Sequence, residues 1–313
     1  MISNEELKNN SISKYTKDIG KEYYNEYDSK KVYNIYSILC AINNKHKTIE
    51  ISILLYTNLS KIIQEITQEI IKVPNKTKEN ILNLIISNEE FKETIKNDFI
   101  SSEYEILDDK ILMILINLHF ISLHYNYNFL FSLEDSFINS LIKKMNKILD
   151  NKNYIDNYSI LSEYCSFFSL ISKNINEKNN KIIIKNIIKI FNNYDIYTKH
   201  HNIYVLEKII LALRSYSLIP ITMNIIKNEI KKILLKIVSI HKKIRNIIFE
   251  EESKRIRFYV LILMPMTFNE GKEITEDIKS NEDIIGLLKE LNNEEKIKDI
   301  VKYINIKLKN NKN

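Results

Sequence analysis

The sequence predicts an all-α protein of stacked antiparallel helix pairs, either an α-solenoid or an irregular helical bundle, with little or no sheet. The first observation is the scarcity of glycine and proline, of which the 313 residues contain only three each. Average proteins contain about 7% Gly and about 5% Pro, and many tight turns and phosphate-binding loops need glycine. The second observation is that apolar residues recur three and four positions apart along nearly the whole chain, which is the helical period. We therefore expect about twelve to fifteen helices.

The first hundred residues predict four or five of these helices. Apolar positions between Tyr33 and Leu39 form one helical series, which Asn43-Asn44 interrupts. The segment Ile49–Ile71 then shows a clear 3.6-residue period, and Pro74 ends it because proline cannot donate the helical hydrogen bond. We interpret residues 1–102 as an N-terminal helical region.

The middle of the chain alternates between two kinds of helix. Strongly apolar helices with aromatic residues are predicted at Ile111–Tyr125, Ile160–Ile171 and Val205–Ile219. Each is followed by an amphipathic helix rich in lysine, at Phe137–Leu149, Lys181–Phe191 and Ile225–Val238. Successive helices of one kind start about 45 residues apart, which fits a stacked αα-hairpin with the period of HEAT and armadillo repeats. The alternative is a non-repetitive helical bundle.

The pattern changes near the C-terminus. Phe258–Phe268 is an apolar run that contains Pro265, and periodicity alone does not decide between a strand and a buried helix. Charged amphipathic segments follow it. We therefore divide the chain into residues 1–102, a basic helical-repeat region at 103–257, and a C-terminal helical cap at 258–313.

Positive charge is concentrated in the second of these regions. The whole chain has a formal net charge of +6, whereas residues 137–257 contain 18 Lys and 4 Arg against 10 acidic residues. Lys181, Lys185 and Lys189 recur at every fourth position and so share one helix face. Lys227, Lys231 or Lys232, and Lys236 repeat this spacing one unit later. Stacked helices would align these side chains into a basic stripe.

Such a stripe has more than one interpretation. It can be a solvated face in a chain whose Ile, Asn and Lys content is typical of an AT-rich genome, a surface for RNA, or a surface for an acidic protein or an anionic membrane. Arginine adds planar contacts that match phosphate geometry. The candidate polyanion-binding residues are Lys181, Lys185, Lys189, Lys227, Lys231, Lys236, Arg245, Arg255 and Arg257.

No catalytic or cofactor motif is present, and we predict no cofactor and no metal. The nucleotide-binding, zinc-protease and serine-hydrolase motifs are all missing from the sequence. Asp108-Asp109 is similar to half of the magnesium site of terpene and prenyl synthases, but a helix cap explains the pair better. His200-His201 lacks further ligands at a suitable spacing.

Several features favour an intracellular protein. Cys40 and Cys165 are far apart and have no metal-ligand or disulfide-scaffold spacing. The N-terminal residues resemble neither a secretory signal nor a mitochondrial presequence. The longest apolar stretch, Ile111–Leu123, is too short for a transmembrane helix. We expect a cytoplasmic location by default, with mitochondria as the alternative.

The middle region resembles the heptatricopeptide-type helical repeats of organellar proteins in apicomplexan parasites. The resemblance covers Leu107–Val238 and rests on units such as ILSEYCSFFSLISKNINEKNNKIIIKNIIKI, in which Leu and Ile alternate with small and aromatic residues. It implies a helical-repeat fold and a role in organellar RNA metabolism. The spacing here is longer than in that family, and the tail lacks the RAP domain found in many members.

We therefore predict a non-enzymatic helical-repeat scaffold that binds a macromolecular partner, either a protein or RNA. No motif that reads DNA sequence is present. The alternatives are a structural subunit of a larger complex and a helical enzyme of the terpene-synthase or prenyl-synthase type.

Overall fold

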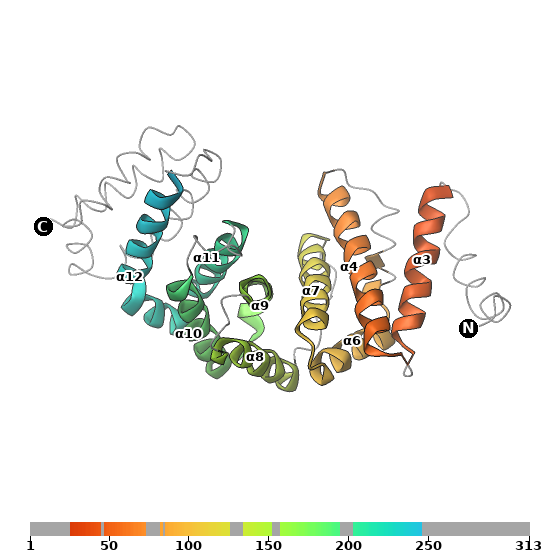
Figure 1. Cartoon of the computed structure of the whole chain (residues 1–313), viewed down its shortest axis with the longest axis horizontal. Coiled ribbons are helices and arrows are strands. Elements are labelled where there is room, and N and C mark those ends of the chain that lie inside the picture. Colours follow the sequence, from red (N-terminus) through yellow and green to blue (C-terminus); the bar gives the residue numbers. More distant parts are fainter. Residues whose placement is uncertain are drawn as a thin grey trace, which may run out of the picture. The chain divides into compact units, whose positions relative to one another are not determined.

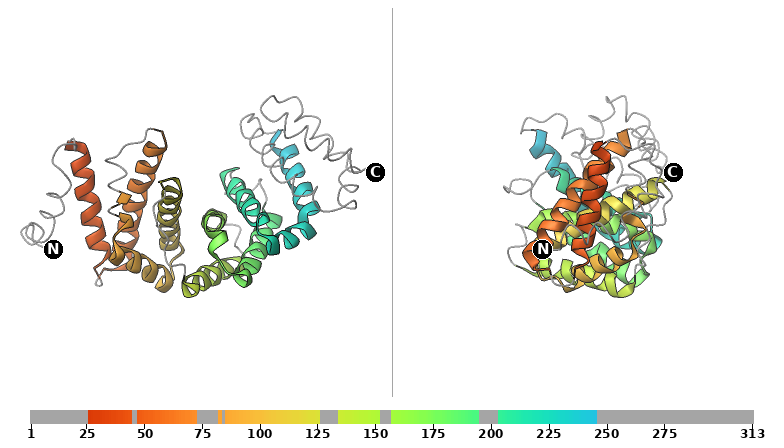
Figure 2. Two further views of the ribbon diagram at one scale, coloured as in Figure 1. Left: turned by 180° about the vertical axis from the view of Figure 1, so that it is seen from behind. Right: turned by 90° about the vertical axis from the view of Figure 1, so that its right-hand side faces the viewer.

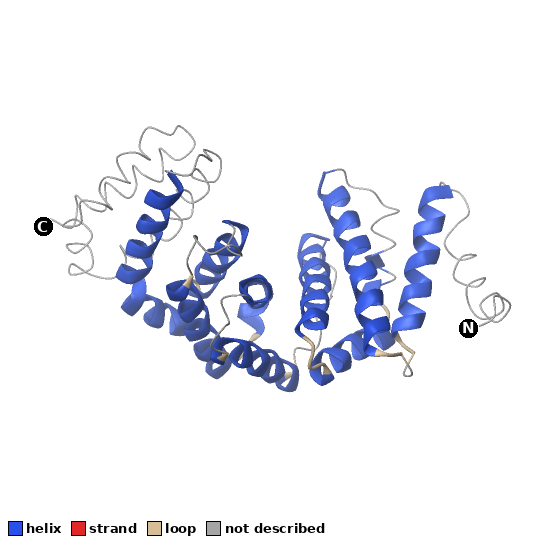
Figure 3. Cartoon of the chain, in the orientation of Figure 1, coloured by secondary structure: helices blue, strands red, loops and turns tan. Residues whose placement is uncertain are grey.

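The computed structural model describes residues 26–44, 47–72, 82–83, 85–125, 134–151, 157–194 and 203–245. Nearly all of these residues are helical and none of them forms a strand (Figure 3). The predicted all-α class is therefore confirmed. The apolar run at 258–268 lies outside the described residues.

Contacts within the chain divide it into two compact units, Met1–Phe129 and Leu130–Asn313, which we call unit 1 and unit 2. The predicted division at residues 102 and 257 was drawn from sequence character and stays a prediction. Each unit is described by itself below.

The described part of unit 1 contains four long helices, which are α3 (Glu26–Ile42), α4 (Ile49–Lys72), α6 (Glu89–Ser101) and α7 (Glu105–Tyr125). Helix α4 lies between α3 and α7, and α6 packs against α7 and α3 (Figure 1). The break at Asn43-Asn44 between the first two helices is confirmed. Helix α4 ends at Lys72, two residues before Pro74.

The core of unit 1 follows from the apolar period. On α4, Tyr56, Leu59 and Ile63 lie on one face and are fully buried. Helix α7 is apolar over most of its circumference, as expected for an element covered on several sides. Asn88 begins α6 as a cap, because its side-chain oxygen accepts a hydrogen bond of 2.9 Å from the Phe91 amide.

Unit 2 consists of two layers of helices (Figures 1 and 2). The apolar helices α9 and α11 pack on each other in one layer, and α8, α10 and α12 pack side by side in the other. Their bounds are α8 (Asp135–Asp150), α9 (Tyr158–Ile171), α10 (Glu177–Asn193), α11 (Ile203–Ser217) and α12 (Pro220–Arg245). A short 3₁₀ turn, η2 (Ser172–Asn174), joins α9 to α10. The predicted alternation of apolar and amphipathic helices is confirmed.

Polar contacts fix how α8 and α10 lie. The Asn176 amide donates to Asp135 at 2.8 Å where both helices begin, and the Asn186 amide donates to Asn146 at 2.7 Å farther along. The Lys189 ammonium lies 3.6 Å from Asp150, near the other end of both helices. Helices α8 and α10 therefore run parallel, with an offset of about 40 residues.

The same relation holds for the next neighbours in each layer. Lys236 of α12 donates to the Asn192 carbonyl oxygen of α10 at 3.2 Å, across 44 residues. In the other layer, Lys208 of α11 forms an ion pair with Glu163 of α9, across 45 residues. Each helix thus pairs with the helix two elements before it, which is the geometry of stacked helix pairs.

Aromatic and amide groups close the turns of unit 2. The rings of Tyr158 and Tyr194 meet edge to face with centroids 5.7 Å apart, which joins the start of α9 to the end of α10. The buried Asn180 amide donates to the carbonyl oxygens of Ser172 and Ile175 and so holds η2 against α10. Pro220 occupies the first position of α12, where its missing amide proton costs nothing.

Candidate functional sites: a lysine face and an acidic groove

Helix α10 presents a row of lysines to solvent. Lys181, Lys185 and Lys189 are all exposed, as predicted, while the opposite side of the helix is buried. Residues four apart on a helix rise about 6 Å along its axis. Lys178 is exposed on the same side. The row therefore forms a continuous basic strip along α10.

The neighbouring helix α8 extends this strip. Its exposed side carries Lys143 and Lys147 at the same spacing of four. Since α8 and α10 run parallel with an offset of about 40 residues, these two lysines lie level with positions 183 and 187 of α10, between the successive lysines of its row. Sequence analysis missed them, although their spacing in Phe137–Leu149 shows the same pattern.

Helix α12 contributes differently from the prediction. Its exposed positions are four apart at Asn224, Asn228 and Lys232. Lys236 is half-buried, and its ammonium reaches the last turn of α10, where the carbonyl groups attract a cation. We define the lysine face by its exposed members, which are Lys143, Lys147, Lys178, Lys181, Lys185, Lys189 and Lys232.

The other predicted candidates are not placed by the structure. Lys227, Lys231 and Arg245 belong to α12, but their side chains lie outside the described part of the chain. Arg255 and Arg257 also lie outside the described residues. Their place in a polyanion site stays a prediction.

Most charges of the lysine face have no acidic partner. Among the described residues, Lys181 and Lys185 form no ion pair, and the pairs at this face are Lys189 with Asp150 and Lys232 with Glu229. Exposed pairs of this kind contribute about 0–1 kcal/mol. Like charges four residues apart on a helix destabilise it by a few tenths of a kcal/mol. The row therefore does not stabilise the fold, and its charge is available to an anion.

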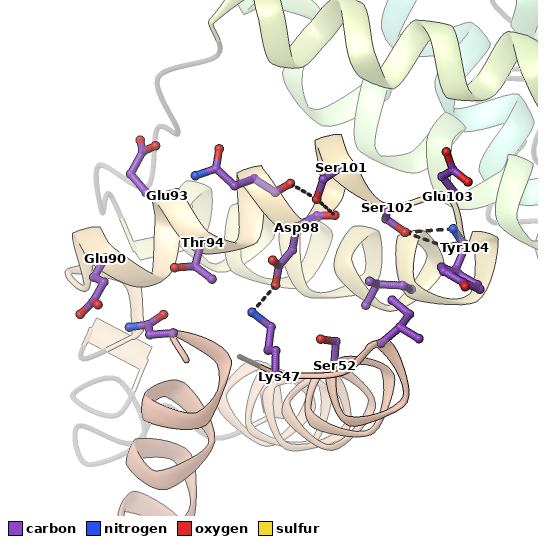
Figure 4. Close-up of a pocket in the computed structure, with 14 residues that line it drawn as sticks. Lys47, Ser52, Glu90, Glu93, Thr94, Asp98, Ser101, Ser102, Glu103 and Tyr104 are labelled. Atoms are coloured by element: carbon purple, nitrogen blue, oxygen red, sulfur yellow. Dashed lines mark hydrogen bonds and ion pairs between the residues drawn. The ribbon is translucent and has the colours of Figure 1, made fainter. Parts of the chain in front are cut away.

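Unit 1 contains a groove of opposite character, with a volume of about 780 Å³ (Figure 4). It lies between the connection from α3 to α4, the helix α6 and the turn from α6 to α7. Four carboxylates and one ammonium are among its lining groups. These are Glu90, Glu93, Asp98, Glu103 and Lys47. We call it the acidic groove.

A polar network holds the groove together. Asp98 points from α6 across the groove to Lys47 (Figure 4), and the two charges are 2.9 Å apart. The buried hydroxyl of Tyr56 donates to the same carboxylate at 2.8 Å. Burial and the adjacent negative charge raise the pKa of Tyr56 well above its ordinary value. Tyr56 therefore stays protonated and keeps donating to Asp98.

Lys47 also fixes the start of the groove. Its ammonium donates to the Ile42 carbonyl oxygen at 2.6 Å, at the C-terminal end of α3, where a cation is favoured. Among the described residues, Glu90 and Glu103 form no ion pair, and both are exposed. Glu93 pairs with Lys96 at 2.9 Å. The groove thus combines a fixed ion pair at its centre with the two exposed carboxylates of Glu90 and Glu103.

The Asp108-Asp109 pair does not cap a helix as predicted, because α7 begins at Glu105 and the pair lies within the helix. Asp108 is buried and Asp109 pairs with Lys110 at 2.7 Å. Asp108 still lies in the first turn, where the helix dipole favours an acidic residue. In the described residues no group of three or more His, Cys, Asp or Glu side chains could hold a metal ion.

Two further residue pairs complete the comparison with the sequence. Cys40 is exposed and Cys165 is buried, and both are free thiols. The pair His200-His201 lies outside the described residues. In the part of the chain that the structure describes, no helix is long and apolar enough to span a bilayer.

Comparisons with protein-family models, with curated proteins and with solved structures found no match for this chain.

Proposed function

We propose that this protein is a helical-repeat scaffold that binds single-stranded RNA along the lysine face of unit 2. The observation that carries the proposal is the row of exposed lysines on α10, continued by Lys143 and Lys147 on the adjacent parallel helix. Single-stranded nucleic acid is bound by positively charged surfaces that follow the phosphate backbone. A flat, continuous row of ammonium groups offers that chemistry.

The stacking of unit 2 supports a repeat. Neighbouring helices of one layer are joined by contacts between residues 40 to 45 apart, and the sequence shows the same period. Stacking places equivalent faces side by side and so creates extended binding surfaces. The resemblance to heptatricopeptide-type proteins points to the same activity and to an intracellular site of action.

The lysine row argues against a purely structural role for this face. Like charges at a spacing of four residues cost stability, and acidic residues four positions away would have stabilised the helix instead. On α8 and α10, the acidic residues of this face, Asp135, Asp150 and Glu177, all lie at helix ends. The middle of α8 and α10 therefore keeps a net positive charge toward solvent.

The experiment is a fluorescence-anisotropy titration of a labelled oligouridine of about twenty nucleotides. The lysine variant carries Lys181→Gln, Lys185→Gln and Lys189→Gln. The matched control also loses three lysines, through Lys61→Gln, Lys92→Gln and Lys173→Gln, none of which belongs to the lysine face. We expect the lysine variant to bind about tenfold or more weakly than the wild type, and the control to bind within about twofold of it.

Two outcomes would contradict the proposal. Equal losses in both variants would mean that only the overall charge matters. Absence of RNA binding by the wild type, with recovery of the protein only in a stable complex with other chains, would favour the alternative of a structural subunit.

A further inference from the structure

The exposed apolar side chains of the described residues gather in unit 1. Five of the seven large apolar side chains that are exposed belong to α4 or to the junction of α6 and α7. These five are Ile51, Leu54, Ile100, Tyr104 and Ile106. Exposed apolar side chains that cluster in this way mark protein interaction sites more often than single ones do.

Three of these side chains surround the turn between α6 and α7. Ile100 is 39% exposed, Tyr104 is 53% exposed and Ile106 is 62% exposed. The turn itself is short, because α6 ends at Ser101 and α7 begins at Glu105. The three exposed side chains thus belong to a stretch of seven residues around this turn, and we call them the apolar corner.

The apolar corner adjoins the acidic groove. Tyr104 lines the groove and belongs to the corner as well, and Figure 4 shows it at one end of the groove. In Figure 4, Glu103 lies beside Tyr104 at this end of the groove, while Glu90 lies toward the other end. A ligand that fills the groove would thus meet carboxylates along its length and apolar groups at one end.

We infer that this surface binds a segment of a protein partner that carries lysine or arginine next to apolar side chains. Asp98 pairs with Lys47 and Glu93 with Lys96, whereas the exposed carboxylates of Glu90 and Glu103 form no ion pair among the described residues. The groove lining therefore attracts a cationic segment and repels a nucleic acid. The apolar corner adds contacts that a polyamine or a metal ion does not use. A groove of about 780 Å³ is also far larger than an ion needs.

The centre of the groove is prepared for such a ligand. Lys47, Tyr56 and Asp98 hold one another in place, so the groove walls need little ordering upon binding. The hydroxyl groups of Ser52 and Thr94 face the groove (Figure 4) and offer acceptors for an ammonium or guanidinium group. This inference uses residues of unit 1 alone, so its test does not depend on whether unit 2 binds RNA.

The test is an anisotropy titration with three labelled twelve-residue peptides. The first alternates leucine and arginine, the second replaces leucine with serine, and the third replaces arginine with glutamate. We expect the first peptide to bind at least about tenfold more tightly than either of the others, since it alone offers both charge and apolar contacts. Absence of binding by the first peptide would overturn the inference.

Variants then locate the binding surface. The groove variant carries Glu90→Gln and Glu103→Gln and keeps Glu93, which pairs with the nearly buried Lys96 at 2.9 Å. The corner variant carries Tyr104→Ser and Ile106→Ser. The control removes two carboxylates from unit 2 through Asp150→Asn and Glu177→Gln. All of these side chains are exposed, so each variant should keep the wild-type circular dichroism. We expect about a tenfold loss in the groove and corner variants and no loss in the control.

Two results would overturn the inference. Equal affinity of the wild type and the groove variant would show that the peptide binds elsewhere. Self-association of the wild type in sedimentation experiments that the groove variant abolishes would show that a second copy of this chain, presenting its lysine face, is the occupant.

Discussion

Unit 1 and unit 2 are built from the same kind of element but carry opposite charge. Residues 1–129 contain 18 acidic and 15 basic residues, whereas residues 130–313 contain 22 acidic and 31 basic ones. Both units bury aliphatic and aromatic side chains between amphipathic helices. The sign of the charge is therefore not a consequence of the helical architecture, and the two ligands that we propose for the two units follow from it.

The two units also secure their turns by different means. Unit 1 uses charge, because the Asp98 carboxylate joins α6 to Lys47 and to Tyr56 of α4. Unit 2 uses neutral groups, since the Asn180 amide and the edge-to-face pair of Tyr158 and Tyr194 hold its turns. A charged network is sensitive to the loss of one partner in a way that a neutral one is not.

The largest expected effect is in the aromatic core of unit 2. Phe168 of α9 is fully buried, so Phe168→Ala removes a large side chain from the core around this helix. We expect it to lower the free energy of unfolding by about 3–5 kcal/mol, measured by urea denaturation. Leu211→Ala on the neighbouring helix is the control, because Leu211 is exposed. A loss below about 1 kcal/mol for Phe168→Ala would mean that this layer is not tightly packed.

The next effect tests the charged network of unit 1. Asp98→Ala leaves the nearly buried ammonium of Lys47 without its carboxylate and the Tyr56 hydroxyl without its acceptor. We expect a loss of about 2–3 kcal/mol in urea denaturation, because unpartnered buried polar groups are costly. Glu103→Ala in the same groove should change stability by less than about 0.5 kcal/mol. Similar losses in the free energy of unfolding for both substitutions would show that the network of Asp98, Lys47 and Tyr56 does not stabilise unit 1.

In unit 2, the neutral side chain of Asn180 holds a turn as the charged Asp98 does in unit 1. Asn180→Ala removes two hydrogen bonds, of 3.1 Å to Ser172 and 2.9 Å to Ile175, which hold η2. We expect a loss of about 1–2 kcal/mol, smaller than for Asp98 because no charge is left unpaired. Asn193→Ala, at an exposed position near the end of α10, is the matched control. A larger loss of stability for Asn180→Ala than for Asp98→Ala would contradict the idea that unit 1 depends more on its charged network than unit 2 does on its neutral contacts.

A smaller, pH-dependent effect arises from buried acids in both units. Burial raises the pKa of the Cys165 thiol above its ordinary 9.0, and it raises the pKa of Tyr56 and of Tyr216 above 10.0. Each group ionises more readily in the unfolded chain than in the folded one. Its contribution to the free energy of unfolding is therefore complete below its ordinary pKa and is lost as the pH rises above it. We expect stability to fall above pH 9, by up to about 1.4 kcal/mol per pH unit for each group.

The Cys165→Ala variant isolates the thiol. Although its stability at pH 8 is lower, it should lose less stability between pH 9 and pH 10 than the wild type does, as measured by the urea midpoint. Parallel pH profiles for the two proteins would show that the thiol is accessible to hydroxide in the folded state.

Much of the helical layout was predictable because the apolar period continues almost without interruption. The predicted segment Ile49–Ile71 agrees with α4 within one residue, and Phe137–Leu149 lies inside α8. Helix starts were predicted less well. Helix α10 begins at Glu177, four residues before the predicted Lys181, because its first turn is polar and Asn176 caps it. A period of apolar residues does not reveal such a turn.

The candidate sites were only partly predictable. The row at Lys181, Lys185 and Lys189 follows directly from the helical period. The place of Lys236 in a polyanion site stays a prediction, and its ammonium also reaches the end of α10, a contact between residues 44 apart that the helical period does not reveal. The acidic groove was missed entirely, since it depends on Asp98 meeting a lysine 51 residues earlier in the chain. Charges that meet only through packing leave no periodic pattern.

The most direct test of the opposite roles of the two units is the salt dependence of RNA binding. Each neutralised phosphate contributes about −0.7 to the slope of log K against log salt for single strands. The variant with Lys181→Gln, Lys185→Gln and Lys189→Gln should therefore have a slope about 2 units shallower than the wild type. The groove variant with Glu90→Gln and Glu103→Gln should keep the wild-type slope. A shallower slope in the groove variant, or an unchanged slope in the lysine variant, would contradict the assignment of RNA to the lysine face.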